Sequence, residues 1–187
     1  MRIALIGPGG TGKTTLAELF AKKHNYPLIP EFAREVAQEL SIPDISKMTP
    51  AESNLFQSGI VFRKVAEESK HKKFIADRSL LDGYVYYILH MLRTDCSKYP
   101  DVELYKSCLE YTKNNYDLLL FIPPFFDHQD DGFRMSRSIE SAAELLLLGL
   151  LHKEHIPYNM FNCPGTPEER LELLTKIVFL RERKKPA

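Results

Sequence analysis

The sequence predicts a single α/β domain, in which a parallel five-stranded sheet is doubly wound with helices on both faces. Five short apolar segments alternate with longer segments whose apolar residues recur at helical spacing. Residues 117–122 form a continuously apolar run that ends at two prolines, which is typical of a strand buried on both faces. The 187 residues suit one domain with a full core, so we expect no division of the chain, residues 1–187.

The composition favours an ordinary globular protein of the cytoplasm. Lys+Arg and Asp+Glu balance at 25 each, so nothing in the charge favours a nucleic acid or an anionic membrane as partner. No apolar run is long enough to span a bilayer, and the first predicted strand leaves no room for a signal peptide. Three scattered cysteines indicate neither a metal site nor a disulfide framework, which favours a reducing compartment.

The first predicted strand, residues 2–6, is followed by a glycine-rich motif and a predicted helix. Residues 7–14 fit the pattern G-x-x-x-x-G-K-[ST] without a gap. A strand before this motif and a helix after it are the context of a phosphate-binding loop. The predicted phosphate-binding residues are Gly7, Gly9, Gly10, Thr11, Gly12, Lys13, Thr14 and Thr15.

The residue types of the motif suit a nucleoside triphosphate with Mg²⁺. Glycines allow successive backbone N–H groups to turn toward a phosphate, and the helix N-terminus adds its own N–H groups and dipole. Lys13 would reach the β- and γ-phosphates, and the Thr14 hydroxyl would bind Mg²⁺.

The next two elements place a carboxylate at the expected ligand edge. Residues 26–30 read as a short strand between prolines, and residues 31–37 read as a helix after it. Glu31 could accept a proton from an attacking hydroxyl, or it could be an acid favoured only by the helix dipole. Arg34, one turn later, could bind an anionic group or pair with a neighbouring glutamate.

A long helix and a third strand follow a connector at residues 41–47. Thr49, Pro50 and Glu52 form a helix start with a capping box, and the helix should reach about residue 70. Its predicted buried residues are Leu55, Phe56, Ile60, Phe62 and Val65.

The third predicted strand, residues 72–77, ends on a second carboxylate. Asp77 could hold Mg²⁺ beside Thr14, and Arg78 offers a planar fork to a phosphate or a hydroxyl-bearing acceptor. Both could instead be residues of a helix start only, since Ser79 caps a predicted helix that continues through Met91.

The remaining elements follow the same alternation. We expect helices at residues 101–113, 138–154 and 167–182, and strands at residues 117–122 and 156–161. The polar segment 125–137 could be a lid, in which Arg134 and Arg137 fold over a phosphoryl group as its charge spreads. The alternative is a solvated charged loop.

These motifs together resemble the nucleoside and nucleotide kinase branch of the P-loop proteins. Residues 7–14 look like its Walker A motif, and residues 77–79 look like the acid-Arg-Ser of deoxynucleoside kinases and the Asp-Arg of thymidylate kinases. Residues 31–35, 74–77, 116–120 and 131–134 are similar, in this order, to the small AAA-type ATPase family that includes the nicotinamide riboside kinase domain of bacterial NAD regulators.

The resemblance implies a P-loop fold with strand order 2-3-1-4-5 and phosphoryl transfer from ATP, with Mg²⁺, to a small hydroxyl acceptor. It implies that Lys13, Glu31, Asp77, Arg78, Arg134 and Arg137 carry the chemistry, and that Thr14 and Asp77 hold the metal. A pocket for the acceptor could be formed by Phe32, Phe56, Gln57, Tyr84 and Tyr87.

Three functions remain open at this point. The preferred one is a kinase for a nucleoside of the deoxynucleoside or nicotinamide riboside type. A nucleoside monophosphate kinase would need a further cation for the acceptor phosphate, for which Arg34 is the candidate. A regulatory ATPase without a small-molecule acceptor belongs to another class. A homodimer is possible in each case.

Overall fold

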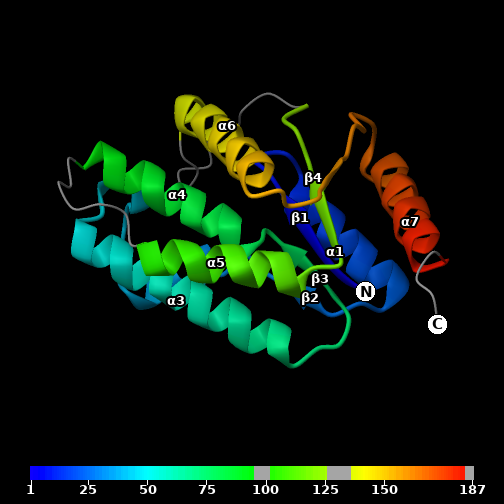
Figure 1. Ribbon diagram of the computed structural model, residues 1–187, viewed down its shortest axis with the longest axis horizontal. Coiled ribbons are helices and arrows are strands. Elements are labelled where there is room, and N and C mark those ends of the chain that lie inside the picture. The colour runs from blue at the N-terminus through cyan, green and yellow to red at the C-terminus, as the bar shows by residue number, and fades with distance from the viewer. Residues whose placement is uncertain (95–101, 126–135, 184–187) are drawn as a thin grey trace.

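The computed structural model describes residues 1–94, 102–125 and 136–183. Its centre is a parallel five-stranded sheet in the order β2-β3-β1-β4-β5, which confirms the predicted fold class and strand order (Figure 1). The strands are β1 (Arg2–Ile6), β2 (Leu28–Ile29), β3 (Phe74–Asp77), β4 (Leu118–Phe121) and β5 (Asn159–Met160).

The helices lie close to the predicted ranges. They are α1 (Lys13–His24), α2 (Ala33–Glu39), α3 (Pro50–Ser69), α4 (Leu80–Arg93), α5 (Val102–Asn115), α6 (Arg137–Lys153) and α7 (Pro167–Arg183), with a 3₁₀ turn at Ile45–Lys47 inside the predicted connector. The capping box predicted at the start of α3 forms between Thr49 and Glu52. Ser79 caps α4 as predicted, and it does so through a second capping box with Asp82.

Helices cover both faces of the sheet. On one face, alternate residues of the central strands, including Ile3, Leu5 and Leu120, pack against α1 and α7. On the other face, the intervening residues, including Ala4 and Phe121, pack against α4 and α6, with α3 and α5 alongside α4 (Figure 1). Strands buried on both faces explain why the strand segments are continuously apolar.

The register brings the ends of β1 and β3 to the same edge of the sheet. Leu5 pairs with Asp77, so the loop that leaves β1 begins beside the carboxylate that ends β3. In a parallel sheet of this kind the carboxyl ends of the strands form the ligand edge. The fold therefore places the glycine-rich loop and Asp77 in one site.

The two edge strands are shorter than predicted. Only two residues of each pair with a neighbour, at β2 and at β5. Pro27, Pro30 and Pro157 flank them, and a proline has no N–H to extend a ladder.

The predicted buried face of α3 is partly wrong. Leu55 and Phe62 are 61% and 76% exposed, whereas the buried stripe runs through Ser53, Gln57 and Lys64. This face borders a cavity, so its residues are more polar than a core-facing stripe, and hydrophobicity alone does not identify it. Within the described residues, no helix has the length and apolar character to cross a membrane.

Candidate active site

The glycine-rich loop has a backbone that only glycine adopts readily. Gly7, Gly10 and Gly12 have φ values of 126°, 73° and 76°, in the region that L side chains rarely adopt. A Cβ on Gly7 would lie 2.6 Å from the carbonyl oxygen of Ile122, which is too close for any side chain. The backbone of the loop therefore packs directly against the residue that follows β4.

The start of α1 opens into a cavity of about 360 Å³ that residues 9–15 help to line. Gly12 precedes α1 and supplies no side-chain cap. Lys13 is buried there, and its ammonium donates hydrogen bonds to the Pro8 carbonyl and, at 3.1 Å, to Thr11 Oγ1. Burial, with the nearby charge of Arg78, lowers the pKa of Lys13 to about 8. The loop, the helix start and Lys13 form a cradle for an anion.

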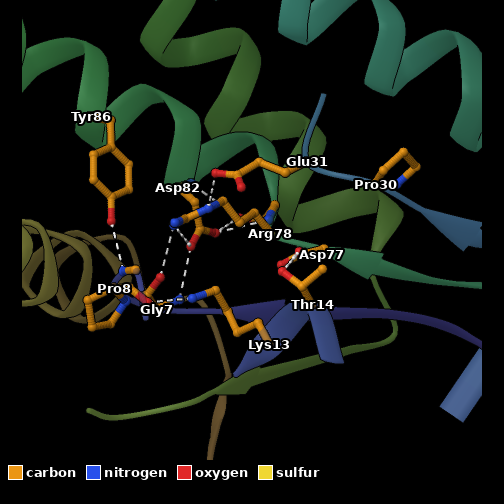
Figure 2. Close-up of polar contacts among 12 residues, drawn as sticks. Gly7, Pro8, Lys13, Thr14, Pro30, Glu31, Asp77, Arg78, Asp82 and Tyr86 are labelled. Carbon is orange, nitrogen blue, oxygen red and sulfur yellow. Dashed lines mark hydrogen bonds and ion pairs between the residues drawn. The ribbon is translucent and has the colours of Figure 1, made fainter. Parts of the chain in front are cut away.

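Asp77 lies beside Thr14 at the floor of the cavity (Figure 2). The Thr14 hydroxyl donates a hydrogen bond to Asp77 Oδ2 at 2.5 Å. Asp77 Oδ1 is buried and has no hydrogen-bond partner among the described residues. Burial, together with the charge of Glu31, raises the pKa of Asp77. An unsatisfied carboxylate oxygen next to a hydroxyl fits a hard divalent cation such as Mg²⁺.

Glu31 and Arg78 form an ion pair across the cavity. Arg78 Nε and Glu31 Oε1 lie 2.5 Å apart, although the N–H is not aligned for a hydrogen bond, and Arg78 Nη1 donates to the Gly7 carbonyl at 3.0 Å. The Glu31 side chain is 42% exposed. Burial opposes its ionisation, but the charges of Arg78 and Lys13 outweigh burial and lower the pKa of Glu31. The helix predicted for residues 31–37 begins later than expected, at Ala33, so Glu31 lies in the connection between β2 and α2 and not in a helix.

Asp82 ties the phosphate loop to the start of α4, a role that the sequence did not indicate. One oxygen accepts the Gly7 N–H at 2.9 Å, and the other accepts the Ser79 N–H at 2.9 Å (Figure 2). Asp82 occupies the third position of α4, where an acid is explained by helix capping alone. The sequence therefore did not indicate its hydrogen bond with Gly7.

The predicted acceptor pocket is assembled in part. Phe56, Gln57 and Tyr87 line the cavity, whereas Phe32 and Tyr84 do not and pack in apolar clusters instead. The side-chain nitrogen of Gln57 is buried and has no hydrogen-bond partner among the described residues. A ligand acceptor atom placed there would satisfy that nitrogen.

Three further residues contact the phosphate loop without having been predicted. Glu140 of α6 and Tyr86 of α4 both accept from the Gly9 N–H, and the Tyr86 hydroxyl also donates to Glu140. Arg170 of α7 is buried and donates to the Thr11 carbonyl at 2.9 Å. Each is separated from the loop by many residues of sequence, so no local pattern could identify it.

The predicted lid is not tested by the structure. Arg134 and most of segment 125–137 lie outside the described residues. Arg137 is exposed at the first residue of α6 and does not line the cavity, whereas Arg34 does.

The parallel sheet with its glycine-rich loop defines a P-loop nucleotide-binding protein. Residues 2–170 match the model of the AAA_28 family, an AAA domain, and the chain belongs to this family. The comparison with curated proteins finds no match.

Several solved proteins, among them two kinases, share the fold. A deoxyadenosine kinase from M. mycoides, solved with dCMP and dCDP, has a TM-score of 0.67 at 14% identity, over 96% of this chain and 100% of that one. NadR in complex with NR has a TM-score of 0.74 at 20% identity, over 99% of this chain and 52% of that one, so the chain spans about half of NadR. Thymidylate kinase from Candida albicans has a TM-score of 0.68 at 16% identity, over 98% and 92% of the two chains.

Proposed function

We propose that the protein is a kinase that transfers the γ-phosphoryl group of ATP to a hydroxyl of a nucleoside. The observation that carries the proposal is that one cavity joins the phosphate loop to the Glu31–Arg78 pair and to Gln57, whose side-chain nitrogen has no hydrogen-bond partner among the described residues. These are the donor and acceptor halves of a two-substrate site. The solved proteins that share the fold, which include a deoxyadenosine kinase and NadR with bound NR, support this choice of acceptor class.

The donor half would hold ATP through the loop N–H groups and Lys13. Residues 9–15 line the cavity, and the buried ammonium of Lys13 lies among them, where it would neutralise phosphate charge. Thr14 and Asp77 would hold Mg²⁺, which supplies charge neutralisation on the phosphates when bound. Asp77 Oδ1, which has no hydrogen-bond partner in the part of the chain that the structure describes, supports that assignment.

Glu31 would act on the acceptor hydroxyl. Its lowered pKa keeps the carboxylate ionised at neutral pH, so it can accept a hydrogen bond from the hydroxyl. It would take the hydroxyl proton as the acceptor oxygen bonds to the γ-phosphorus and the bond between that phosphorus and the oxygen of the departing ADP breaks. Arg78 holds Glu31 from one side and the Gly7 carbonyl from the other, which fixes the carboxylate relative to the phosphate loop. Arg134 and Arg137 would stabilise the charge that spreads over the transferring phosphoryl group.

The acceptor ring would lie between α3 and α4. Phe56 and Tyr87 supply aromatic surface, and the Gln57 amide supplies hydrogen bonds, a combination that suits a nucleobase or a nicotinamide. A nucleoside monophosphate is the second candidate, and it is favoured by one observation, that Arg34 also lines the cavity. We place the protein in the cytoplasm, where ATP, Mg²⁺ and nucleosides are present.

A substrate panel tests the proposal. The purified protein is mixed with ATP–Mg²⁺ and with nucleosides, nucleoside monophosphates or nicotinamide riboside, and both thermal shift and ATP consumption are measured. We expect one nucleoside to raise ATP consumption, and Lys13→Ala to abolish it, while Lys22→Ala on the exposed side of α1 leaves it unchanged. ATP consumption that no acceptor stimulates would favour a regulatory ATPase.

A further inference from the structure

The buried face of α3 carries a lysine that the proposed mechanism does not use. Lys64 is 2% exposed and lines the same cavity as the phosphate loop. Lysine is rarely buried to this extent unless its ammonium is paired. The groups that contact the Lys64 ammonium should therefore indicate its role.

The Lys64 ammonium joins the two strand ends that carry the candidate carboxylates. It donates to the Asp77 carbonyl at 3.0 Å and makes a longer hydrogen bond of 3.4 Å to the carbonyl of Pro30. Pro30 immediately precedes Glu31 in the chain and lies near it in Figure 2. One side chain thus holds the backbone of Asp77 and the backbone next to Glu31.

The ladder between β2 and β3 does not reach Pro30 and Asp77, although Asp77 also pairs with Leu5 of β1 on its other side. Pairing between β2 and β3 stops at Ile29 and Ala76, one residue before Pro30 and Asp77 respectively. Lys64 links the segments that leave β2 and β3, at the point where the ladder between them ends.

The backbone just beyond this link is strained. Phe32 and Arg78 have φ values of 65° and 69°, although neither is glycine. Such conformations persist only where the surrounding structure holds them. The hydrogen bonds from Lys64 to the carbonyls of Pro30 and Asp77 help to hold this strained backbone in place.

We propose that Lys64 is a positioning residue for phosphoryl transfer, which sets the distance between Glu31 and Asp77 by holding the carbonyls of Pro30 and Asp77. The inference rests on the proposed function. If Glu31 meets the acceptor and Asp77 meets the metal, their separation fixes the alignment of the hydroxyl with the phosphorus. A misplacement of about 1 Å can cost on the order of 10²-fold in rate.

A purely structural role for Lys64 makes a different prediction. Glu68 lies 3.8 Å from the Lys64 ammonium and accepts hydrogen bonds from Tyr111 at 2.9 Å and from Tyr116 at 2.8 Å. If Lys64 only neutralises Glu68, removal of both charges should restore the enzyme. If Lys64 positions the strand ends, the removal of both charges should restore folding but not the rate.

The experiment compares wild type, Lys64→Met, Glu68→Gln and the double variant Lys64→Met/Glu68→Gln. Melting temperature, kcat, and KM for ATP and for the acceptor are measured for each. We expect the double variant to fold, to keep both KM values within about threefold, and to lose on the order of 10²-fold in kcat. Glu68→Gln alone should keep its kcat, because Lys64 retains both carbonyl contacts.

An amine rescue identifies the missing group. In Lys64→Ala/Glu68→Gln, added propylammonium should raise kcat, and propanol of the same length should not. A folded double variant with wild-type kcat would overturn the inference, as would equal rescue by propanol. A double variant that does not fold would make Lys64 a folding determinant rather than a positioning residue. Absence of turnover in the wild type would instead overturn the proposed function, and this inference with it.

Discussion

At the scale of single residues, the proposed mechanism assigns the acceptor hydroxyl to Glu31 and the ATP phosphates to Lys13 and Thr14. Glu31 is linked to the loop through Arg78, which pairs with Glu31 and donates to the Gly7 carbonyl, whereas Lys13 and Thr14 belong to the first turn of α1. Loss of the Glu31 charge should therefore affect the chemical step without disturbing the ATP cradle.

Glu31→Gln should lower kcat strongly, by about 10²-fold or more, because the amide cannot take a proton from the acceptor hydroxyl. The KM for ATP should change little. Steady-state kinetics with saturating acceptor measures both. Glu35→Gln, the same change at an exposed site of α2, is the control. Normal turnover in Glu31→Gln would show that Glu31 does not act as the base and serves only to pair with Arg78.

Gln57→Leu tests the acceptor half of the site. It removes the buried nitrogen that has no partner among the described residues, and with it the hydrogen bond proposed for the acceptor ring. A bond of this kind contributes about 0.5–1.5 kcal/mol, so KM for the acceptor should rise several-fold while KM for ATP stays constant. Gln38→Leu on the exposed face of α2 is the control. An unchanged KM for the acceptor would show that the acceptor ring does not bind at Gln57.

At the scale of elements, α7 supports the phosphate loop from outside the P-loop motif. Arg170 donates to the Thr11 carbonyl, and a Cβ on Gly12 would lie 2.7 Å from the Arg170 guanidinium. Arg170→Met should leave the Thr11 carbonyl without this donor and cost on the order of 1–3 kcal/mol of stability. Urea unfolding and KM for ATP should both report the loss, and Arg181→Met, exposed in the same helix, should report neither. An unchanged KM for ATP would show that the contact between Arg170 and the phosphate loop does not affect ATP binding.

The packing of α1 on α7 should depend on pH through His24. Its ring accepts or donates a hydrogen bond with Thr175 at 2.9 Å and packs against Phe20 and Phe179. Burial, with the charge of Lys23, lowers the pKa of His24 below its ordinary value of 6.5. The unfolded chain therefore binds the proton more readily than the folded one.

The stability contributed by neutral His24 should be fully present above pH 6.5 and lost as the pH falls through 6.5 toward the lowered folded value. Urea unfolding between pH 5 and pH 8, about the range over which histidine titrates, measures this. His24→Gln should flatten that part of the profile. An identical profile in the variant would show that His24 does not contribute.

Sequence patterns identify the elements better than the contacts between them. The phosphate loop, the order of strands and helices, the capping box at Thr49 and the cap at Ser79 depend on short local patterns, and the structure confirms them. Leu55 and Phe62 were misplaced because hydrophobicity alone cannot show that α3 turns a polar stripe toward a cavity.

The contacts that complete the site come from residues far apart in the chain. Asp82, Glu140 and Arg170 reach the loop from three helices across 75, 131 and 159 residues. Lys64 lies on a stripe whose spacing is ordinary for a helix. No local pattern distinguishes such residues from surface charges, so only the fold reveals them.

At the scale of the whole molecule, we propose that one edge of the sheet carries both halves of the site, an ATP cradle and a nucleoside pocket, which share one cavity. The register of β1 against β3 brings the halves together, and helices α3 and α4 supply the acceptor side. A regulatory ATPase would need only the first half.

The most direct test follows the labelled γ-phosphoryl group of ATP. The protein is mixed with ATP labelled at that position, Mg²⁺ and the nucleoside panel, and the products are separated and identified by mass spectrometry. We predict that the label is transferred to a hydroxyl of one nucleoside, and that Lys13→Ala forms no such product. Label recovered only as inorganic phosphate, with every nucleoside unmodified, would contradict the account.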